Sequence, residues 1–321
     1  MWPSEVYSGE VAVMDTSQEQ NAHLPLHSPA MVAEVLQVLQ PVRGERAIDL
    51  TAGTGGHALV LAERLGPEGL LIGIDADLQA LRVAKARLAE SAPCPFKLFR
   101  CRFSEAQEVA REAGVEGFHI ALADLGVGTH QLDDPSRGFS FESEAKLDMR
   151  FDDSAELSAW DVVNRTPQRQ LAEIFQNFGE ERFSNQIAAA IFRERQEHTI
   201  DSPAQLSELV KRVAARYSGG RTWRIHPATR VAMALRIFVN DELGEFEKLL
   251  ELLPSLLVRG GRMAILTYHS LEARRVKLAW QQQKRQGIIE IITKRPLRPS
   301  PEEVARNPRA RSAQLRAARR I

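Results

Sequence analysis

Short apolar runs alternate with amphipathic stretches over the first 124 residues and again towards the C-terminus. The apolar runs predict strands over residues 47–50, 70–74, 96–99, 119–123, 262–268 and 288–293. Helical periodicity predicts helices over residues 57–65, 77–90, 104–113, 228–257 and 271–286, the fourth interrupted near Pro254. Near-continuous apolar strands separated by helices are typical of a parallel sheet covered on both faces. The pattern therefore predicts an α/β fold, a mostly parallel doubly wound sheet.

The middle of the chain follows a different pattern. Residues 125–153 are rich in Gly, Asp, Ser and Phe and predict a long loop, whereas residues 155–217 show helical periodicity only. Helices are expected over 159–163, 168–178, 185–195 and 203–217, with Ser202 as the N-cap of the last and Pro203 in its first turn. A helical block between two parts of an α/β chain predicts an inserted subdomain. We expect it to span residues 134–223, with 27–133 and 224–321 forming the α/β domain.

The two ends of the chain differ in charge. Residues 1–26 are polar, acidic and aperiodic, so we expect a flexible leader, followed by a helix that Ser28 caps. From Arg274 onwards there are 14 Lys or Arg against 3 Glu, and the last stretch, rich in Pro and Arg, is expected to be an extended basic tail. Such a tail indicates a polyanionic partner such as nucleic acid, or else a solvated helix face and a frayed end.

Composition narrows the class of protein. The chain of 321 residues is 44% apolar and 26% charged with a formal charge of zero, which is ordinary for a globular protein. No apolar run approaches the roughly 20 residues that cross a bilayer, and no signal-peptide pattern is present. Cys94 and Cys101 have no zinc-like spacing, which predicts free thiols in a reducing compartment and no metal site. A cytoplasmic location with no membrane association is expected.

A glycine-rich turn is the first candidate for chemistry. Gly53-x-Gly55-x-x-Ala58 follows the first predicted strand and opens a helix, as in sites that bind dinucleotides. Asp75 ends the second strand 22 residues after Gly53, where a carboxylate can accept hydrogen bonds from ribose hydroxyls. The pattern favours an adenosine-bearing cofactor without choosing NAD over S-adenosylmethionine. The alternatives are a glycine turn with no ligand and an Asp75 that only starts a turn.

Three features favour S-adenosylmethionine over NAD. His57 places a bulky ring on a turn where a pyrophosphate needs bare backbone. Asp124 ends the fourth strand and puts a carboxylate at the edge of the sheet where ligands bind. The remaining chain contains a helical insert instead of a second α/β lobe. An NAD-dependent oxidoreductase stays open as an alternative, supported by the glycines and Asp75 alone.

Separated sequence blocks resemble the ribosomal RNA small subunit methyltransferase H family from His27 to about Arg316. The blocks include Asp49-x-Thr-x-Gly-x-Gly-Gly-His57, Gly73-Ile-Asp-x-Asp77, Asp124-Leu-Gly-Val127, Leu147-Asp-Met-Arg150, His226-Pro-Ala-Thr-Arg230, His269-Ser-Leu-Glu-x-Arg274 and Asn307-Pro-Arg-x-Arg-Ser-Ala313. The resemblance implies a class I methyltransferase fold, S-adenosylmethionine as cofactor, and methylation of N4 of a cytidine in 16S ribosomal RNA. It also implies the small ribosomal subunit as partner, and says nothing of the oligomeric state.

Carried over by position, the resemblance implies a set of cofactor-binding residues. These are Gly55, Gly56 and His57 at the turn, Asp75 at the ribose, Phe103 near the adenine, Asp124 near the methionine end, and Gln131 in the loop that follows. Phe103 follows the third strand, where its ring could pack on adenine, although a core position is the alternative for a phenylalanine. Asp124 is also the candidate catalytic residue, as acceptor of the proton that leaves the amine, unless it binds the cofactor's amino group instead.

The chain departs from the family pattern at several positions. Gly128, Thr129 and His130 precede Gln131, Ala273 replaces a second acid, and the strand before it ends in Tyr268. These departures affect substrate positioning more than cofactor binding, and leave a catalytically silent RNA-binding protein as a second alternative. Further candidates each have a structural alternative. Phe139 and Phe141 could stack on a base or anchor the loop, and His226, Arg230, His269 and Arg274 could meet phosphates or cap helices.

Overall fold

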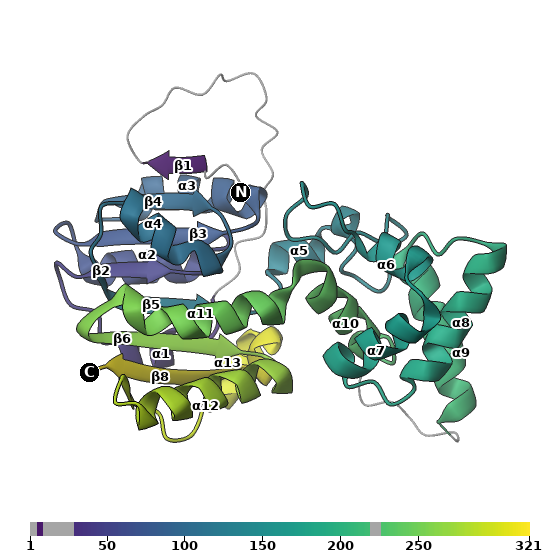
Figure 1. The fold of residues 1–321 in the computed structure, drawn as a ribbon. Helices are drawn as coiled ribbons and strands as arrows, with labels where there is room; N and C mark the ends of the chain where they lie inside the picture. Colours follow the sequence, from purple (N-terminus) through teal and green to yellow (C-terminus); the bar gives the residue numbers. More distant parts are fainter. Residues whose placement is uncertain (1–4, 9–28, 219–225) are drawn as a thin grey trace, which may run out of the picture. The chain divides into compact units, whose positions relative to one another are not determined.

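The computed structural model describes residues 5–8, 29–218 and 226–321. Within these ranges the chain forms one eight-stranded sheet, in the order β1-β4-β3-β2-β5-β6-β8-β7 (Figure 1). The strands are β1 (Glu5–Ser8), β2 (Arg46–Asp49), β3 (Leu70–Asp75), β4 (Phe96–Arg100), β5 (Phe118–Asp124), β6 (Leu257–Thr267), β7 (Ile289–Ile291) and β8 (Gln314–Arg320). The expected α/β class is confirmed, and each of the six predicted strands is present with ends shifted by a few residues.

The central strands are parallel and the outer ones antiparallel. β4, β3, β2, β5 and β6 pair in parallel, while β8 runs antiparallel between β6 and β7. β1 adds an antiparallel edge beside β4, so the predicted leader contains a short strand, and residues 9–28, with the predicted cap Ser28, lie outside the described residues. The strand order reverses at β2, between β3 and β5. Ligands bind at such a switch point, outside the carboxyl ends of the strands.

Alternate residues of each strand supply the two faces of the sheet. In β5, Ala121 and Ala123 join a buried cluster with α4, α11 and α12, whereas Ile120 and Leu122 join a second cluster with α1, α2 and α3. This alternation explains why the strands read as continuous apolar runs. The helices around the sheet are α1 (Val32–Leu39), α2 (Gly56–Leu65), α3 (Leu78–Ser91), α4 (Ala106–Glu112), α11 (Glu242–Leu256), α12 (Ser270–Arg285) and α13 (Pro301–Arg306).

Contacts within the chain divide it into two compact units, residues 1–126 with 245–321, and residues 127–244. The second unit is helical and has its own buried cluster, built from residues of several helices such as Val162, Phe175, Ile191 and Val210. Its elements are α5 (Thr129–Asp133), the 3-10 turn η2 (Pro135–Arg137), α6 (Ala159–Arg165), α7 (Gln168–Gly179), α8 (Ser184–Glu197), α9 (Pro203–Tyr217) and α10 (Thr229–Asn240). Ser202 caps α9 as predicted, since its side chain accepts a hydrogen bond from the Gln205 backbone.

The single helix predicted over 228–257 is wrong. α10 ends where Asp241 adopts a left-handed conformation, with φ of 50°, and α11 begins at Glu242. The expected interruption near Pro254 does not occur, because this residue lies in the last turn of α11. A proline there frees the carbonyl four residues earlier, that of Leu250. The Gln283 side chain donates a hydrogen bond to that carbonyl at 2.7 Å, which satisfies it.

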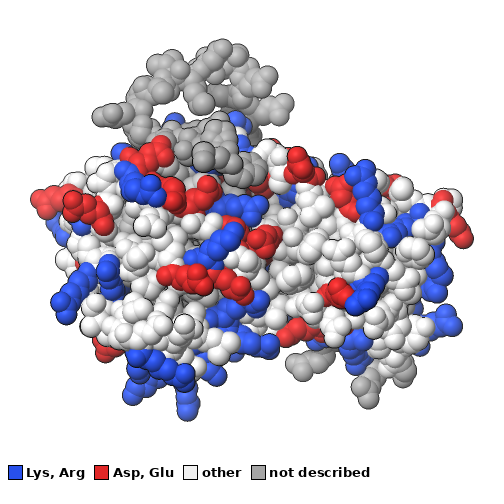
Figure 2. All heavy atoms as spheres, viewed as in Figure 1, with Lys and Arg blue, Asp and Glu red and all other residues white. Residues whose placement is uncertain are grey.

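The basic C-terminal stretch is extended only in part. Residues 314–320 form β8, where Leu315, Ala317 and Ala318 are buried, so the arginines there belong to a strand inside the sheet. α13 and the 3-10 turn η3 (Pro308–Ser312) precede it and were not predicted. On the face drawn in Figure 2, lysine and arginine side chains gather over α12 at the lower edge.

Two smaller expectations concern membranes and thiols. Among the described residues, no helix is both long and apolar enough to cross a bilayer. Cys94 and Cys101 are both buried free thiols, as predicted.

Candidate cofactor site

The glycine turn joins the end of β2 to the start of α2. Gly53 and Gly55 have φ of 51° and 82°, in the left-handed region that glycine adopts without strain. A Cβ on Gly55 would also lie 3.2 Å from Cα of Ala84 in α3, so only glycine fits there. Gly55 is the N-cap of α2 and forms no side-chain cap. The first N–H groups of α2 therefore face the carboxyl edge of the sheet, where they favour an anionic or polar ligand group.

Asp75 fastens this turn to the end of β3. One carboxylate oxygen accepts the Gly53 N–H at 2.7 Å, and the other accepts the Asp77 N–H at 2.8 Å. Each ionised carboxylate oxygen can accept more than one hydrogen bond, so the arrangement still suits the two hydroxyls of a ribose. Asp77 in turn caps α3 by accepting from the backbone N–H groups of Gln79 and Ala80.

Asp124 is held at the end of β5 by three partners. Its Oδ2 lies 3.3 Å from His57 Nε2, and its Oδ1 accepts a 2.7 Å hydrogen bond from the Tyr268 hydroxyl. Its backbone N–H donates to the Thr51 hydroxyl at 2.7 Å. His57 comes from the first turn of α2 and Tyr268 directly follows β6, so two neighbouring elements fix the carboxylate that ends β5. Asp49, at the end of β2 and 1% exposed, lies beneath them.

Asp49, His57, Tyr268 and Asp124 form one cluster, and burial affects the pKa values of the first three. Burial raises the pKa of Asp49 to about 6, against the opposing charge of His57. Burial by itself would lower the pKa of His57, but the contact with Asp124 and the charge of Asp49 outweigh it, so the pKa is raised. The pKa of Tyr268 is raised by burial and by Asp124. Tyr268 therefore stays a neutral donor to Asp124 at physiological pH.

Two buried polar atoms of the cluster have no hydrogen-bond partner among the residues that the structure describes. Asp49 Oδ2 and His57 Nε2 are both enclosed, and the 3.3 Å approach of His57 to Asp124 does not have hydrogen-bond geometry. Buried polar atoms are rarely left unsatisfied in a native protein. An unsatisfied pair at the carboxyl edge, next to an open helix N-terminus, fits a site that receives the polar groups of S-adenosylmethionine.

The structure brings most of the predicted cofactor residues together. Gly55, Gly56, His57, Asp75 and Asp124 all lie at the carboxyl ends of β2, β3 and β5. Phe103 begins the 3-10 turn η1 (Phe103–Glu105) after β4, at the same edge, and packs partly buried against the sheet cluster.

Gln131 belongs to the helical unit instead. It is buried in α5, where its side-chain oxygen accepts the Gly128 N–H at 3.0 Å and caps the helix.

The further candidates form structural contacts. Phe139 is buried and stacks on Phe151 with ring centroids 5.8 Å apart, which favours its role as an anchor of the loop. Phe141 stacks on the His226 ring at 4.9 Å. Arg230 donates to the Glu180 carbonyl at 3.1 Å, a contact within the helical unit.

His269 is the N-cap residue of α12. Its Nε2 lies 3.1 Å from the buried Glu272 carboxylate. The other oxygen of Glu272 accepts the Tyr268 N–H at 2.8 Å. The start of α12 is thereby fixed directly after Tyr268.

Three members of the cluster were not predicted as site residues: Asp49, Thr51 and Tyr268. The signal was present, because each lies at or just after the carboxyl end of a predicted parallel strand. Tyr268 had been noted only as a departure from a family pattern. Its hydroxyl reaches Asp124 across the sheet, a pairing that requires the β5–β6 register, in which Asp124 lies opposite Leu266.

Comparison with known proteins agrees with this geometry. The model of the MraW methylase family matches residues 25–321. Ribosomal RNA small subunit methyltransferase H of Acidobacterium capsulatum is 42% identical over 298 residues, covering 91% of this chain and 97% of the relative. The protein of the same name from Koribacter versatilis is 42% identical and covers 92% and 94%.

Among solved structures, an rRNA methylase from Streptococcus thermophilus is similar at 14% identity with a TM-score of 0.40, covering 90% of this chain and 93% of that one. That likeness is too low to bear on function. The strand order, the glycine turn and the family match along most of the chain agree with one another. The chain belongs to the MraW methylase family, with the α/β fold of class I S-adenosylmethionine-dependent methyltransferases.

Proposed function

We propose that this protein methylates the N4 amine of a cytidine in 16S ribosomal RNA, with S-adenosylmethionine as the methyl donor. The observation that carries the proposal is the Asp124 cluster beside the glycine turn: a carboxylate fixed by His57 and Tyr268 at the edge of the sheet where the cofactor binds. The curated relatives are named as small subunit ribosomal RNA methyltransferases, which supports the choice of substrate.

The chemistry requires alignment more than a strong base. S-adenosylmethionine supplies an electrophilic methyl group on a sulfonium, and displacement proceeds in line with the attacking nitrogen. The N4 lone pair of cytosine is delocalised into the ring, so a hydrogen-bond acceptor on the amine raises its nucleophilicity. Once the nitrogen carries the new methyl group it is strongly acidic, and a carboxylate suffices to accept its proton.

We assign the acceptor role to Asp124 and a positioning role to Tyr268. The Tyr268 hydroxyl occupies one oxygen of Asp124 and His57 lies against the other, so the carboxylate has one orientation. A carboxylate held in one orientation by these two neighbours suits a hydrogen-bond acceptor for an amine. Gly55, Gly56, Asp75 and Phe103 would hold the cofactor beside it, and Gln131 stays a proposed cofactor contact on the sequence resemblance alone.

Exposed cationic side chains in the segment around α13 support an RNA substrate. α13 packs at the turn, because Glu303 accepts the Met31 N–H at 2.5 Å and its charge acts on His57. The segment around α13 exposes six cationic side chains: Lys294, Arg295, Arg298, Arg306, Arg309 and Arg311. Exposed lysine and arginine side chains attract the phosphates of nucleic acid. We further propose that residues 127–244 recognise the substrate and that the protein acts in the cytoplasm on the small ribosomal subunit.

The test is methyl transfer from labelled S-adenosylmethionine to small subunits isolated from a strain that lacks the enzyme. We expect incorporation by the wild-type protein. Asp124→Asn keeps the shape but loses the charge, and should lower kcat by about a hundredfold or more. Cofactor affinity, measured by calorimetry, separates the two roles of Asp124. If Asp124→Asn retains full turnover and only binds the cofactor more weakly, then Asp124 is not the acceptor. Cofactor binding by the wild type without any transfer would point to a silent RNA-binding protein.

A further inference from the structure

A surface groove on the helical unit lies between α8 and α9. It encloses about 450 Å³, which is within the range of small-molecule and nucleotide sites. Its floor is apolar and formed by Ala190, Leu209 and Val213, all nearly buried. The groove is lined entirely by residues of α8 and α9, so it is a feature of this unit alone.

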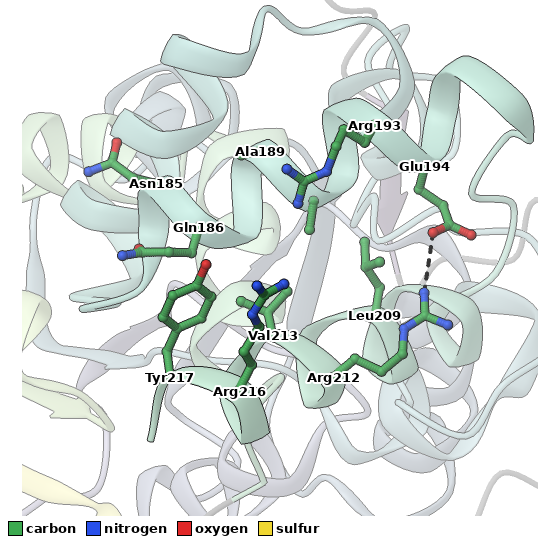
Figure 3. Close-up of a pocket in the computed structure, with 11 residues that line it drawn as sticks. Asn185, Gln186, Ala189, Arg193, Glu194, Leu209, Arg212, Val213, Arg216 and Tyr217 are labelled. Carbon is green, nitrogen blue, oxygen red and sulfur yellow. Dashed lines mark hydrogen bonds and ion pairs between the residues drawn. The ribbon is translucent and has the colours of Figure 1, made fainter. Parts of the chain in front are cut away.

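Positive charge faces the groove from both helices. Figure 3 shows the guanidinium groups of Arg193, from α8, and Arg216, from α9, pointing into the same space. Arg212 lines it as well and pairs with Glu194 at 3.2 Å, in an exposed ion pair. The lining therefore carries three arginines and one carboxylate, that of Glu194. Guanidinium groups bind phosphate oxygens in a bidentate manner, so this is the chemistry of a phosphate-binding groove.

An aromatic ring and two amides complete the lining. Tyr217, 48% exposed, lies beside Gln186 in Figure 3, with the Arg216 guanidinium 5.8 Å from its ring centre. Phe183 supports it from a tilted position 6.2 Å away. Bases of single-stranded nucleic acid stack on such exposed rings, and amide groups such as those of Asn185 and Gln186 can bond base edges.

We propose that this groove binds a single-stranded segment of the RNA substrate, outside the reacting nucleotide, through its phosphates and one stacked base. The inference rests on the proposed function. An unpaired strand is favoured over a duplex because the Tyr217 ring can stack only on a base that is free of its partner. An acidic peptide would use the arginines but would leave the exposed ring and the amides without a role.

The test compares two double variants that each remove two positive charges from the helical unit. Arg193→Gln with Arg216→Gln removes the groove cations. Arg165→Gln with Arg169→Gln is the matched control, since these side chains are 71% and 93% exposed and pair with Asp161 and Glu173 on α6 and α7. The readouts are KM and kcat for methyl transfer to small subunits, and the affinity for a labelled oligouridylate of about a dozen nucleotides as a function of salt.

The groove variant should raise KM about tenfold with little change in kcat, and should reduce the salt slope of oligouridylate binding by about 1. The control variant should change KM by less than about twofold and leave the salt slope of oligouridylate binding nearly unchanged. Tyr217→Ala should weaken oligouridylate binding about fivefold or more without changing the salt slope, whereas Tyr217→Phe should restore it, because stacking needs only the ring. Unfolding curves verify that each variant is folded.

Two outcomes would overturn the inference: an unchanged KM and salt slope in the groove variant, or an equal loss in the control, which would indicate diffuse attraction only. These outcomes differ from failure of the proposed function itself. In that case the wild-type protein transfers no methyl group to RNA, whatever its affinity for the oligouridylate.

Discussion

At the scale of single residues, the candidate site depends on carboxylates whose neighbours set different tasks for them. Asp75 accepts two backbone N–H groups and fastens the glycine turn. Asp124 is oriented by two side chains, whereas Asp49 is buried and accepts the Thr51 backbone N–H at 3.2 Å. In the proposed mechanism, the same side-chain type therefore binds the cofactor at Asp75, accepts a proton at Asp124, and supports the charge of His57 at Asp49.

Asp75 and Asp77 provide a matched pair for cofactor binding. Asp75→Ala should weaken S-adenosylmethionine binding by about a hundredfold or more, because the ribose loses a charged acceptor. Asp77→Ala removes the N-cap of α3 and should cost about 1 kcal/mol of the free energy of unfolding, with cofactor affinity almost unchanged. Calorimetric titration and urea unfolding of both variants measure the two effects. Retained affinity in Asp75→Ala would remove this residue from the site.

Asp49 makes stability depend on pH. Its pKa is about 6 in the fold against an ordinary 3.8, so between these values the folded protein binds more protons than the unfolded chain. Stability due to this group therefore falls as the pH rises from about 4 to 6, by up to ~3 kcal/mol. Asp49→Asn carries no charge and should be more stable than the wild type by ~1–3 kcal/mol at pH 8, and equally stable near pH 4. Urea unfolding across that range checks this. A difference that does not vary with pH would exclude the buried charge as its cause.

At the scale of elements, the glycine turn could be predicted from the sequence, but its backbone geometry could not. The spacing of Gly53 and Gly55 indicated a ligand-binding turn, and the structure gives both a positive φ. The close approach of Ala84 depends on how α3 packs beside α2, which no local pattern encodes. The break at Asp241 was missed for a related reason. One residue in the left-handed region, with no glycine or proline, separates two helices whose apolar stripes read as one.

A comparison of substitutions at Gly55 and Gly260 distinguishes the cost of backbone strain from the cost of a steric clash. Both have φ of 82°, but a Cβ on Gly55 meets Ala84 at 3.2 Å, whereas nothing lies within 4 Å of one on Gly260. Gly260→Ala should cost about 1–2 kcal/mol of unfolding free energy and leave cofactor affinity unchanged. Gly55→Ala should cost about 1–3 kcal/mol more and weaken S-adenosylmethionine binding at least tenfold, because the turn must shift. Equal losses of unfolding free energy and of cofactor affinity in the two variants would argue against a turn whose shape depends on the contact with Ala84.

At the scale of the whole molecule, periodicity predicted a helical insert but did not fix where its ends lie. The helical insert was expected over residues 134–223. Contacts within the chain place residues 127–244 in one compact unit. The short helix α5 has too few residues for a periodic signal, and α10 was read as continuous with α11. The basic tail was expected to be extended, and its last part is the extended strand β8, whose small apolar residues are buried in the sheet while Arg319 is exposed. The family resemblance supplied Gln131 and Phe103, which strand ends and spacing alone would not single out.

We propose that the Asp124 site methylates an exocyclic amine of cytidine in ribosomal RNA. The most direct measurement is mass spectrometry of nucleosides from the 16S RNA of small subunits that lack the modification, treated with this protein and isotope-labelled S-adenosylmethionine. Labelled N4-methylcytidine is expected at one site with the wild-type protein, and none with the Asp124→Asn variant. Label on a ring carbon, on ribose or on another base, or no label in the RNA, would contradict it.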